Sequence, residues 1–160
     1  MDRRSLLLGA STLAAFGASR VAEPEAPSPG MNPPKERVQG IGGLFFRSRD
    51  PKTLAEWYER HLGIDPTPTD YDKPVWNQAA GPTVFAPFPM DTKYFGAPQQ
   101  AWMVNFRVRS LDAMVAQLRA SSIAVDVDTQ VYPNGRFARL HDPDGNPIEL
   151  WEPGGRTSQP

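Results

Sequence analysis

The chain contains no cysteine and only two histidines among its 160 residues. The absence of cysteine excludes disulfide bonds, thiolate metal sites, a cysteine nucleophile and a lipoprotein anchor. The net charge of −1, with 22% charged residues, lacks the positive excess typical of nucleic-acid-binding proteins, so we expect no nucleic-acid partner. No phosphate-binding glycine loop is indicated, because Gly40-Ile41-Gly42-Gly43 opens a predicted strand and not a helix. The composition is that of one ordinary soluble domain of roughly 100–150 residues.

The first 22 residues are typical of an export signal. Arg3-Arg4 precede a short run of apolar and small residues, and a pair of arginines before Leu6-Leu7-Leu8 resembles the twin-arginine type. The run is shorter than the roughly 20 residues of a membrane span. This predicts a periplasmic or secreted protein with no span in its mature form, whereas a start at Met31 would predict a cytoplasmic one. Residues 23–38 are rich in proline and are predicted to be a linker, and residues 154–160 a tail.

A repeat at a spacing of 60 residues divides the remaining domain, residues 39–153. Phe46-Arg47-Ser48-Arg49 recurs as Phe106-Arg107-Val108-Arg109. Each copy leads into an amphipathic helix pattern, which begins after Asp50 in the first half and after Ser110 in the second. Further strands are predicted over residues 75–80, 83–88, 123–131, 135–140 and 148–151. We therefore predict an α+β fold of two paired βαβββ modules, at about 39–98 and 99–153.

Side chains alternate between the two faces of each predicted strand. The even positions around residues 44–46 and 104–108 are apolar and are expected to pack under the helices. The odd positions of the same strands and of the last strand are mixed. We therefore expect a curved mixed sheet with helices on its outer face and a concave cavity on the other, able to hold a ligand.

The closing segment DPDGNPIELWEP, at residues 142–153, joins a turn to a strand in which Glu149 and Trp151 share one face. Together with the paired modules and the helix pattern that ends WYERHLG, this segment resembles the vicinal oxygen chelate superfamily. That superfamily includes glyoxalase I, extradiol dioxygenases, fosfomycin- and bleomycin-resistance proteins and methylmalonyl-CoA epimerase. The resemblance covers about residues 38–153 and implies the paired-module fold.

The resemblance also implies a divalent metal on the concave face, which polarises two vicinal oxygens of a substrate or activates dioxygen. Glu149 stands at the carboxylate ligand position of the last strand. The first-strand ligand position, usually histidine, falls on Gly43 or Gly42, and its counterpart in the second module falls on Met103. The strand at 83–88 offers neither histidine nor glutamate. Most of the usual ligand positions are thus not filled, and a site needs three or more protein ligands.

Glu149 is the first candidate for a catalytic residue, as metal ligand, general base or substrate contact. The alternative for Glu149 is an ion pair with Arg47 or Arg107. His141, just before the turn, is a second candidate base or ligand, whereas His61 is expected only to stabilise the end of its helix. The arginines suit a substrate carboxylate or phosphate, and the segment at residues 94–96 is a candidate lid. The predicted substrate-binding residues are Phe45, Arg47, Trp76, Met103, Asn105, Arg107, Arg136 and Trp151.

Two classes of function fit these residues. The first is an enzyme that acts on a small oxygen-rich organic molecule, as a metal-dependent lyase, isomerase or dioxygenase. The second is a metal-independent protein of the bleomycin-resistance type that binds or sequesters a small molecule. Ionisable groups beside aromatic ones favour the enzyme, and the missing histidine ligands favour the binding protein. A duplicated domain that serves only oligomer assembly is a third interpretation, and both a monomer and a homodimer remain open.

Overall fold

The computed structural model describes residues 35–155, and every structural statement below concerns these residues. The predicted export signal, most of the predicted linker and most of the tail lie outside them. The chain divides into two units, Met1–Leu44 and Phe45–Pro160, which are described separately. In the first unit, residues 35–44 are exposed and contain neither helix nor strand.

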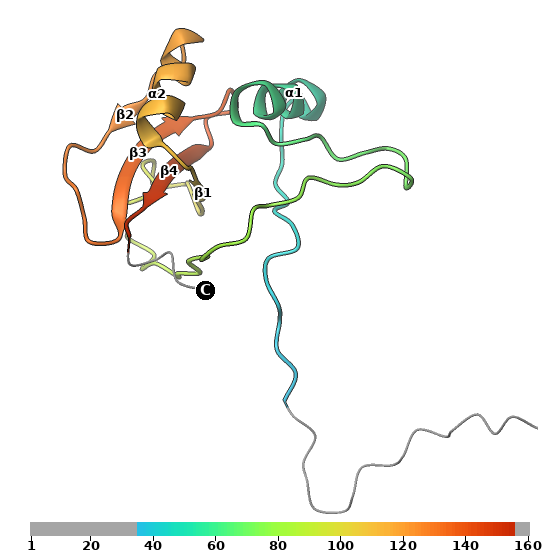
Figure 1. Cartoon of the computed structure of the whole chain (residues 1–160), viewed down its shortest axis with the longest axis horizontal. Helices are drawn as coiled ribbons and strands as arrows, with labels where there is room; N and C mark the ends of the chain where they lie inside the picture. Colours follow the sequence, from blue (N-terminus) through green and yellow to red (C-terminus); the bar gives the residue numbers. More distant parts are fainter. Residues whose placement is uncertain (1–34, 156–160) are drawn as a thin grey trace, which may run out of the picture. The chain divides into compact units, whose positions relative to one another are not determined.

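The described part of the second unit contains two helices and a four-stranded mixed sheet (Figure 1). The strand order is β1-β4-β3-β2, with β1 parallel to β4 and the other neighbours antiparallel. This is the α+β class that the sequence predicts. The elements are α1 (Pro51–Leu62), β1 (Val104–Arg107), α2 (Leu111–Ala120), β2 (Asp126–Val127), β3 (Gly135–His141) and β4 (Pro147–Pro153).

Both helices begin where their capping residues predict. The Asp50 carboxylate accepts hydrogen bonds from the Thr53 backbone N–H, at 3.1 Å, and from its hydroxyl, at 2.7 Å. These bonds lower the pKa of Asp50. Helix α1 ends at Leu62 and is capped by Gly63, whose φ of 68° lies in the left-handed region that glycine adopts without strain. At the start of α2, the Ser110 hydroxyl accepts a bond from the Ala113 N–H at 3.3 Å.

The hydrophobic core lies between the sheet and the helices. Ile148 and Leu150 of β4 are fully buried, as are Leu111 and Leu118 of α2. Leu54 of α1 joins the same cluster. The core side of β4 and β3 therefore carries the even-numbered residues, as the alternation predicts, and the odd-numbered residues face the other way.

Asp142 organises the turn between β3 and β4 and ties it to α1. Its buried carboxylate accepts bonds from the backbone N–H groups of Asp144 and Asn146, at 2.9 and 2.8 Å. The same carboxylate accepts a bond from the Asn146 side chain at 2.8 Å and one from the Tyr58 hydroxyl at 2.9 Å. Burial and the neighbouring Asp142 carboxylate raise the pKa of Tyr58, so that this hydroxyl remains a donor. The DPDGN motif thus forms a turn and also connects that turn to α1 through Tyr58.

The second half of the domain forms the predicted βαβββ order, β1-α2-β2-β3-β4, although β2 is only two residues long. The strands predicted over residues 75–80 and 83–88, and in the stretch around residues 44–47, are not formed in the described structure. Their apolar side chains are exposed, as in Phe45 at 95% and Phe85 at 88%. Alternation predicts strand-forming residues but not a partner for them, and without a partner no ladder forms. The pairing of two complete modules stays a prediction.

None of the helices in the described residues is both long and apolar enough to cross a membrane.

Replacement of Asp142 with alanine is expected to lower the free energy of unfolding by about 2–4 kcal/mol, because four donors lose a buried acceptor. Replacement of Tyr58 with phenylalanine removes one of these bonds and is expected to cost about 1 kcal/mol. Urea unfolding followed by tryptophan fluorescence measures both. Asp91→Ala, at an exposed carboxylate with no hydrogen bond among the described residues, is the control. Equal midpoints for Asp142→Ala and Asp91→Ala would show that the turn does not depend on this carboxylate.

Candidate functional site

Three neighbouring strands bring polar side chains into one row on the face of the sheet opposite the core. The register pairs Asn105 of β1 with Glu149 of β4, and Glu149 with Arg139 of β3. Because residues directly opposite each other project from the same face, these three side chains lie together. Glu149 is only 5% exposed even though it faces away from the core.

The Glu149 carboxylate is held by three side chains. Its Oε1 atom accepts hydrogen bonds from the Tyr94 hydroxyl, at 2.7 Å, and from Nη2 and Nε of Arg139, at 3.2 and 3.3 Å. Its Oε2 atom accepts a bond from the Asn105 amide at 2.8 Å. We refer to Tyr94, Asn105, Arg139 and Glu149 as the Glu149 cluster. Both oxygens of this buried carboxylate are therefore hydrogen-bonded, as a buried charge requires.

Tyr94 reaches the cluster from the connection between α1 and β1, the segment predicted as a lid. The Arg139 guanidinium lies over the Tyr94 ring, 4.1 Å from its centroid, and Nη1 donates to the Tyr94 carbonyl at 3.4 Å. The Phe88 ring stacks on Tyr94 with a centroid separation of 5.0 Å. Burial, together with the hydrogen bond to Glu149, raises the pKa of the Tyr94 phenol. The hydroxyl therefore stays protonated and donating at neutral pH.

A small cavity of about 110 Å³ adjoins the cluster. It is much smaller than the roughly 300–1,000 Å³ typical of sites for drug-sized ligands. Two of the predicted site residues, Met103 and the exposed His141, meet here beside Arg139 and Tyr94. The lining consists of Tyr94, Phe95, Gly96, Met103, Arg139, Leu140, His141, Pro147 and Ile148.

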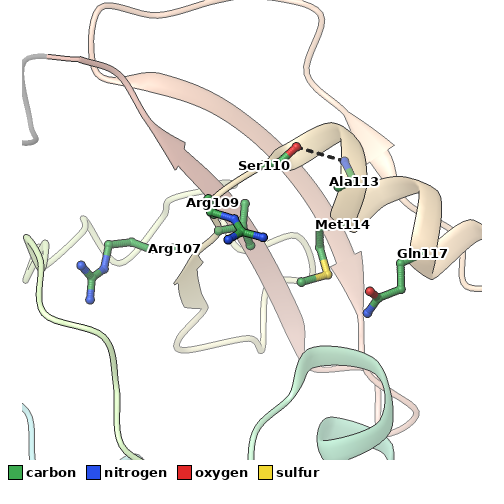
Figure 2. A pocket seen from close by; sticks show the side chains of 7 residues that line it. Arg107, Arg109, Ser110, Ala113, Met114 and Gln117 are labelled. Carbon is green, nitrogen blue, oxygen red and sulfur yellow. Dashed lines mark hydrogen bonds between the residues drawn. The ribbon is translucent and has the colours of Figure 1, made fainter.

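A second cavity, of about 310 Å³, lies beside the start of α2 and shares no lining residue with the first. In Figure 2, Met114 and Gln117 project from α2, and Arg107 extends away from that helix. The Arg107 guanidinium donates to the Ala79 carbonyl at 2.7 Å. A Cβ atom on Gly81 would approach Arg107 Cζ to 2.7 Å, so glycine permits this close contact. Arg107 is therefore bound to backbone and not to Glu149.

The predicted ion pair between Glu149 and Arg47 or Arg107 is wrong, because the partner is Arg139 at 3.2 Å. Arg47 is exposed and makes neither a hydrogen bond nor an ion pair with any described residue. Phe45 is also exposed, and the half-buried Trp76 lines neither cavity.

Two further predicted site residues have structural partners. Trp151 follows Glu149 by two residues on β4, so it projects from the same face of the sheet. Its ring stacks on the ring of Phe137, with a centroid separation of 6.3 Å. Its indole N–H donates to the Asn134 carbonyl at 2.7 Å. Arg136 projects from the opposite face and binds the Asp112 carboxylate of α2 through both terminal nitrogens, at 3.0 and 2.6 Å. These bonds lower the pKa of Asp112. Arg136 therefore joins β3 to α2 and lies apart from the Glu149 cluster.

Arg139 was not among the predicted site residues, although the alternation of residues in its strand indicates its position. In GRFARL, Arg139 alternates with Ala138 and Leu140, so it must project from the face that carries Phe137. A tight turn at residues 142–146 then places Arg139 opposite Glu149. Tyr94 has no comparable signal, because its position depends on the path of a connection without helix or strand.

The donor set around Glu149 does not fit a divalent metal held by protein side chains. Within residues 35–155, no three or more His, Asp or Glu side chains are grouped so that they could hold a metal ion. The groups that surround the carboxylate are a phenol, an amide and a guanidinium, and the cationic Arg139 repels a second cation at this position. The Met103 side chain, where the resemblance places a ligand, lines the adjoining cavity instead.

The fold agrees with a comparison against known families. The model of the glyoxalase-like domain family matches residues 43–151. The chain belongs to this family. It is thereby a member of the vicinal oxygen chelate superfamily, of the glyoxalase and bleomycin-resistance type. A search of curated proteins found no match.

Several solved structures are similar to this chain. A glyoxalase/bleomycin resistance protein from Streptomyces sp. CB03234 is 35% identical, with a TM-score of 0.30, over 33% of this chain and 46% of that one. The chain thus spans about half the length of that relative. TnmS3, an antibiotic binding protein from Streptomyces sp. CB03234, is 22% identical over 75% of this chain and 100% of that one, with a TM-score of 0.49. A putative glyoxalase family protein from Bacillus anthracis is 18% identical over 64% and 83%, with a TM-score of 0.41.

Replacement of Tyr94 with phenylalanine is expected to lower the free energy of unfolding by about 1 kcal/mol, by removing its bond to Glu149. Because the pKa of Tyr94 is raised in the folded state, this contribution is fully present below the ordinary tyrosine pKa of about 10 and is lost as the pH rises through the folded value. The difference from wild type is therefore constant from about pH 6 to 9 and shrinks above about pH 10. Urea unfolding across this range measures it.

Tyr71→Phe is the matched control, because this tyrosine is fully exposed and makes no hydrogen bond with any described residue. Its unfolding free energy should equal that of wild type throughout. A Tyr94→Phe difference that stayed unchanged to pH 11 would contradict the hydrogen bond between Tyr94 and Glu149.

Proposed function

We propose that this protein binds a small organic molecule at the face that carries Glu149, without a metal, as a binding protein of the bleomycin-resistance type. The observation that supports this most directly is the Glu149 cluster itself. A buried carboxylate with a guanidinium, an amide and a hydroxyl around it is a set of oriented polar groups beside an apolar lining. A few oriented polar groups in an apolar concavity are typical of sites that bind small molecules.

The character of the neighbouring groups favours binding over metal-dependent catalysis. Metal chemistry on Glu149 requires additional anionic or imidazole ligands, whereas the groups that contact it are a phenol, an amide and a guanidinium, all of which donate to it. A carboxylate surrounded by donors serves instead to anchor a donor group of a ligand. Met103 and Phe95 provide apolar surface for the rest of the molecule.

One observation supports an enzyme as the second candidate. His141 is exposed and lines the cavity next to Arg139. Histidine changes its charge near neutral pH and is a frequent general base. A lyase or isomerase that uses His141 to remove a proton from the bound molecule fits this position.

Binding is tested by the thermal stability of chelator-treated protein in a panel of small oxygen-bearing aromatic and aliphatic molecules. A ligand at 100 times its Kd adds about 2.7 kcal/mol to the stability, which raises the Tm of a domain of this size by several degrees. Glu149→Gln, which keeps the shape but loses the charge, should weaken binding at least about tenfold, since a charge-assisted bond is lost. Arg60→Gln, at an exposed arginine of α1, is the control and should bind as wild type does. Binding that appears only after a divalent metal is restored would overturn the proposal.

The enzymatic candidate predicts that a bound carbonyl compound exchanges a proton for deuterium in D₂O, as NMR detects. His141→Ala should then abolish the exchange with little change in affinity, because a general base contributes roughly 10²–10⁴-fold to the rate. No exchange with any ligand that binds would leave binding as the sole function.

A further inference from the structure

The Tyr94 side chain is held in the manner of a bound ligand. Its hydroxyl donates to the Glu149 carboxylate at 2.7 Å, and its ring lies against the Arg139 guanidinium, 4.1 Å away, and the Phe88 ring, at 5.0 Å. A charge-assisted hydrogen bond, a cation–π contact and an aromatic stack are the interactions by which proteins recognise a phenol. No other aromatic side chain in residues 35–155 donates to Glu149.

The segment that carries Tyr94 depends on this residue for its hydrogen bonds to the sheet. The described bonds of residues 89–99 are local turns, such as Thr92 N–H to the Pro89 carbonyl at 3.0 Å and Gly96 N–H to the Lys93 carbonyl at 3.1 Å. The bonds from this segment to β3 and β4 are made by the Tyr94 hydroxyl and the Tyr94 carbonyl. Release of Tyr94 therefore removes the described hydrogen bonds between this segment and β3 and β4, and it breaks no strand or helix.

Tyr94 and Phe95 form part of the wall of the small cavity beside the cluster. With about 110 Å³ available, there is too little room for a ligand of ordinary size while Tyr94 is bound. The space that a ligand needs is the space that the Tyr94 side chain takes up.

We propose that Tyr94 is an intramolecular stand-in for the ligand, and that this site takes a planar aromatic molecule with a free hydroxyl group. The ligand replaces Tyr94 on Glu149 and Arg139, and the segment at 89–99 moves aside. This proposal rests on the proposed binding function and names the class of molecule that the site binds. A carboxylate ligand is excluded, because Glu149 repels it and Arg139 is already paired with Glu149. The earlier expectation of a carboxylate or phosphate held by arginines therefore does not extend to this site.

The test uses p-cresol, which is the tyrosine side chain as a free molecule, and 4-methylanisole, in which a methyl group blocks the hydroxyl. Isothermal titration measures both against the full chain and its Tyr94→Ala variant. We expect p-cresol to bind Tyr94→Ala at least about tenfold more tightly than wild type, because Tyr94 occupies the wild-type site for most of the time. We expect p-cresol, and not 4-methylanisole, to raise the Tm of the variant towards that of wild type.

Tyr94→Phe provides a second variant that keeps the ring and is expected to fold even if Tyr94→Ala does not. It loses the bond to Glu149 and should bind p-cresol with an affinity between those of wild type and Tyr94→Ala. Tyr71→Ala, at an exposed position, is the matched control and should bind as wild type does.

Three outcomes separate this proposal from the proposed function. Equal or weaker p-cresol affinity in both Tyr94 variants, with other small molecules still bound through Glu149, overturns the stand-in and leaves the binding function in place. Equal affinity for 4-methylanisole and p-cresol overturns the hydroxyl requirement. Failure of wild type and both variants to bind any molecule of the panel overturns both proposals.

Discussion

The register between β3 and β4 is the constraint on which the core and the site both depend. The Asp142 carboxylate closes the turn between these strands with bonds of 2.8–2.9 Å, and so places Leu140 opposite Ile148 and Arg139 opposite Glu149. A slip by one residue would exchange the two faces of the hairpin. It would expose Ile148 and place the Glu149 charge against α2. The same turn binds α1 through Tyr58, so one buried carboxylate connects turn, helix packing and site.

The buried charge of Glu149 explains why the residues around it are donors. A carboxylate that is 5% exposed has lost most of its hydration and must recover that energy from hydrogen bonds. Asn105 and Arg139 are supplied by the neighbouring strands, so two of the donors come with the fold. Tyr94 is supplied by a segment without regular structure and is the donor that the fold can most easily exchange. The chemistry of the site therefore differs from that of a metal centre, where the neighbours would be acceptors.

The features that depend only on residues close together in the sequence were predicted correctly. The caps at Asp50 and Ser110, the turn at residues 142–146 and the two faces of β4 all follow from residue type and alternation. The same alternation, applied to β3, would also have predicted the face from which Arg139 projects. Prediction failed where a partner had to be identified, as with the strands at 75–80 and 83–88 and the ion pair of Glu149. Tyr94 was predicted only as part of a candidate lid, because no periodic pattern connects a loop residue to a strand 55 positions away.

The need of Glu149 for a donor also explains how the proposed site can be stable when empty and still bind a neutral ligand. If Tyr94 left without replacement, Oε1 would keep only its bonds to Arg139, and the buried carboxylate would be under-satisfied. A ligand hydroxyl restores the bond that is lost, so the exchange conserves the number of hydrogen bonds on the carboxylate. A ligand with no donor cannot restore it and must displace Tyr94 at the full cost of that bond. In the proposed exchange, selectivity for hydroxyl-bearing molecules thus arises from the stability of the empty protein, and not from an added specificity pocket.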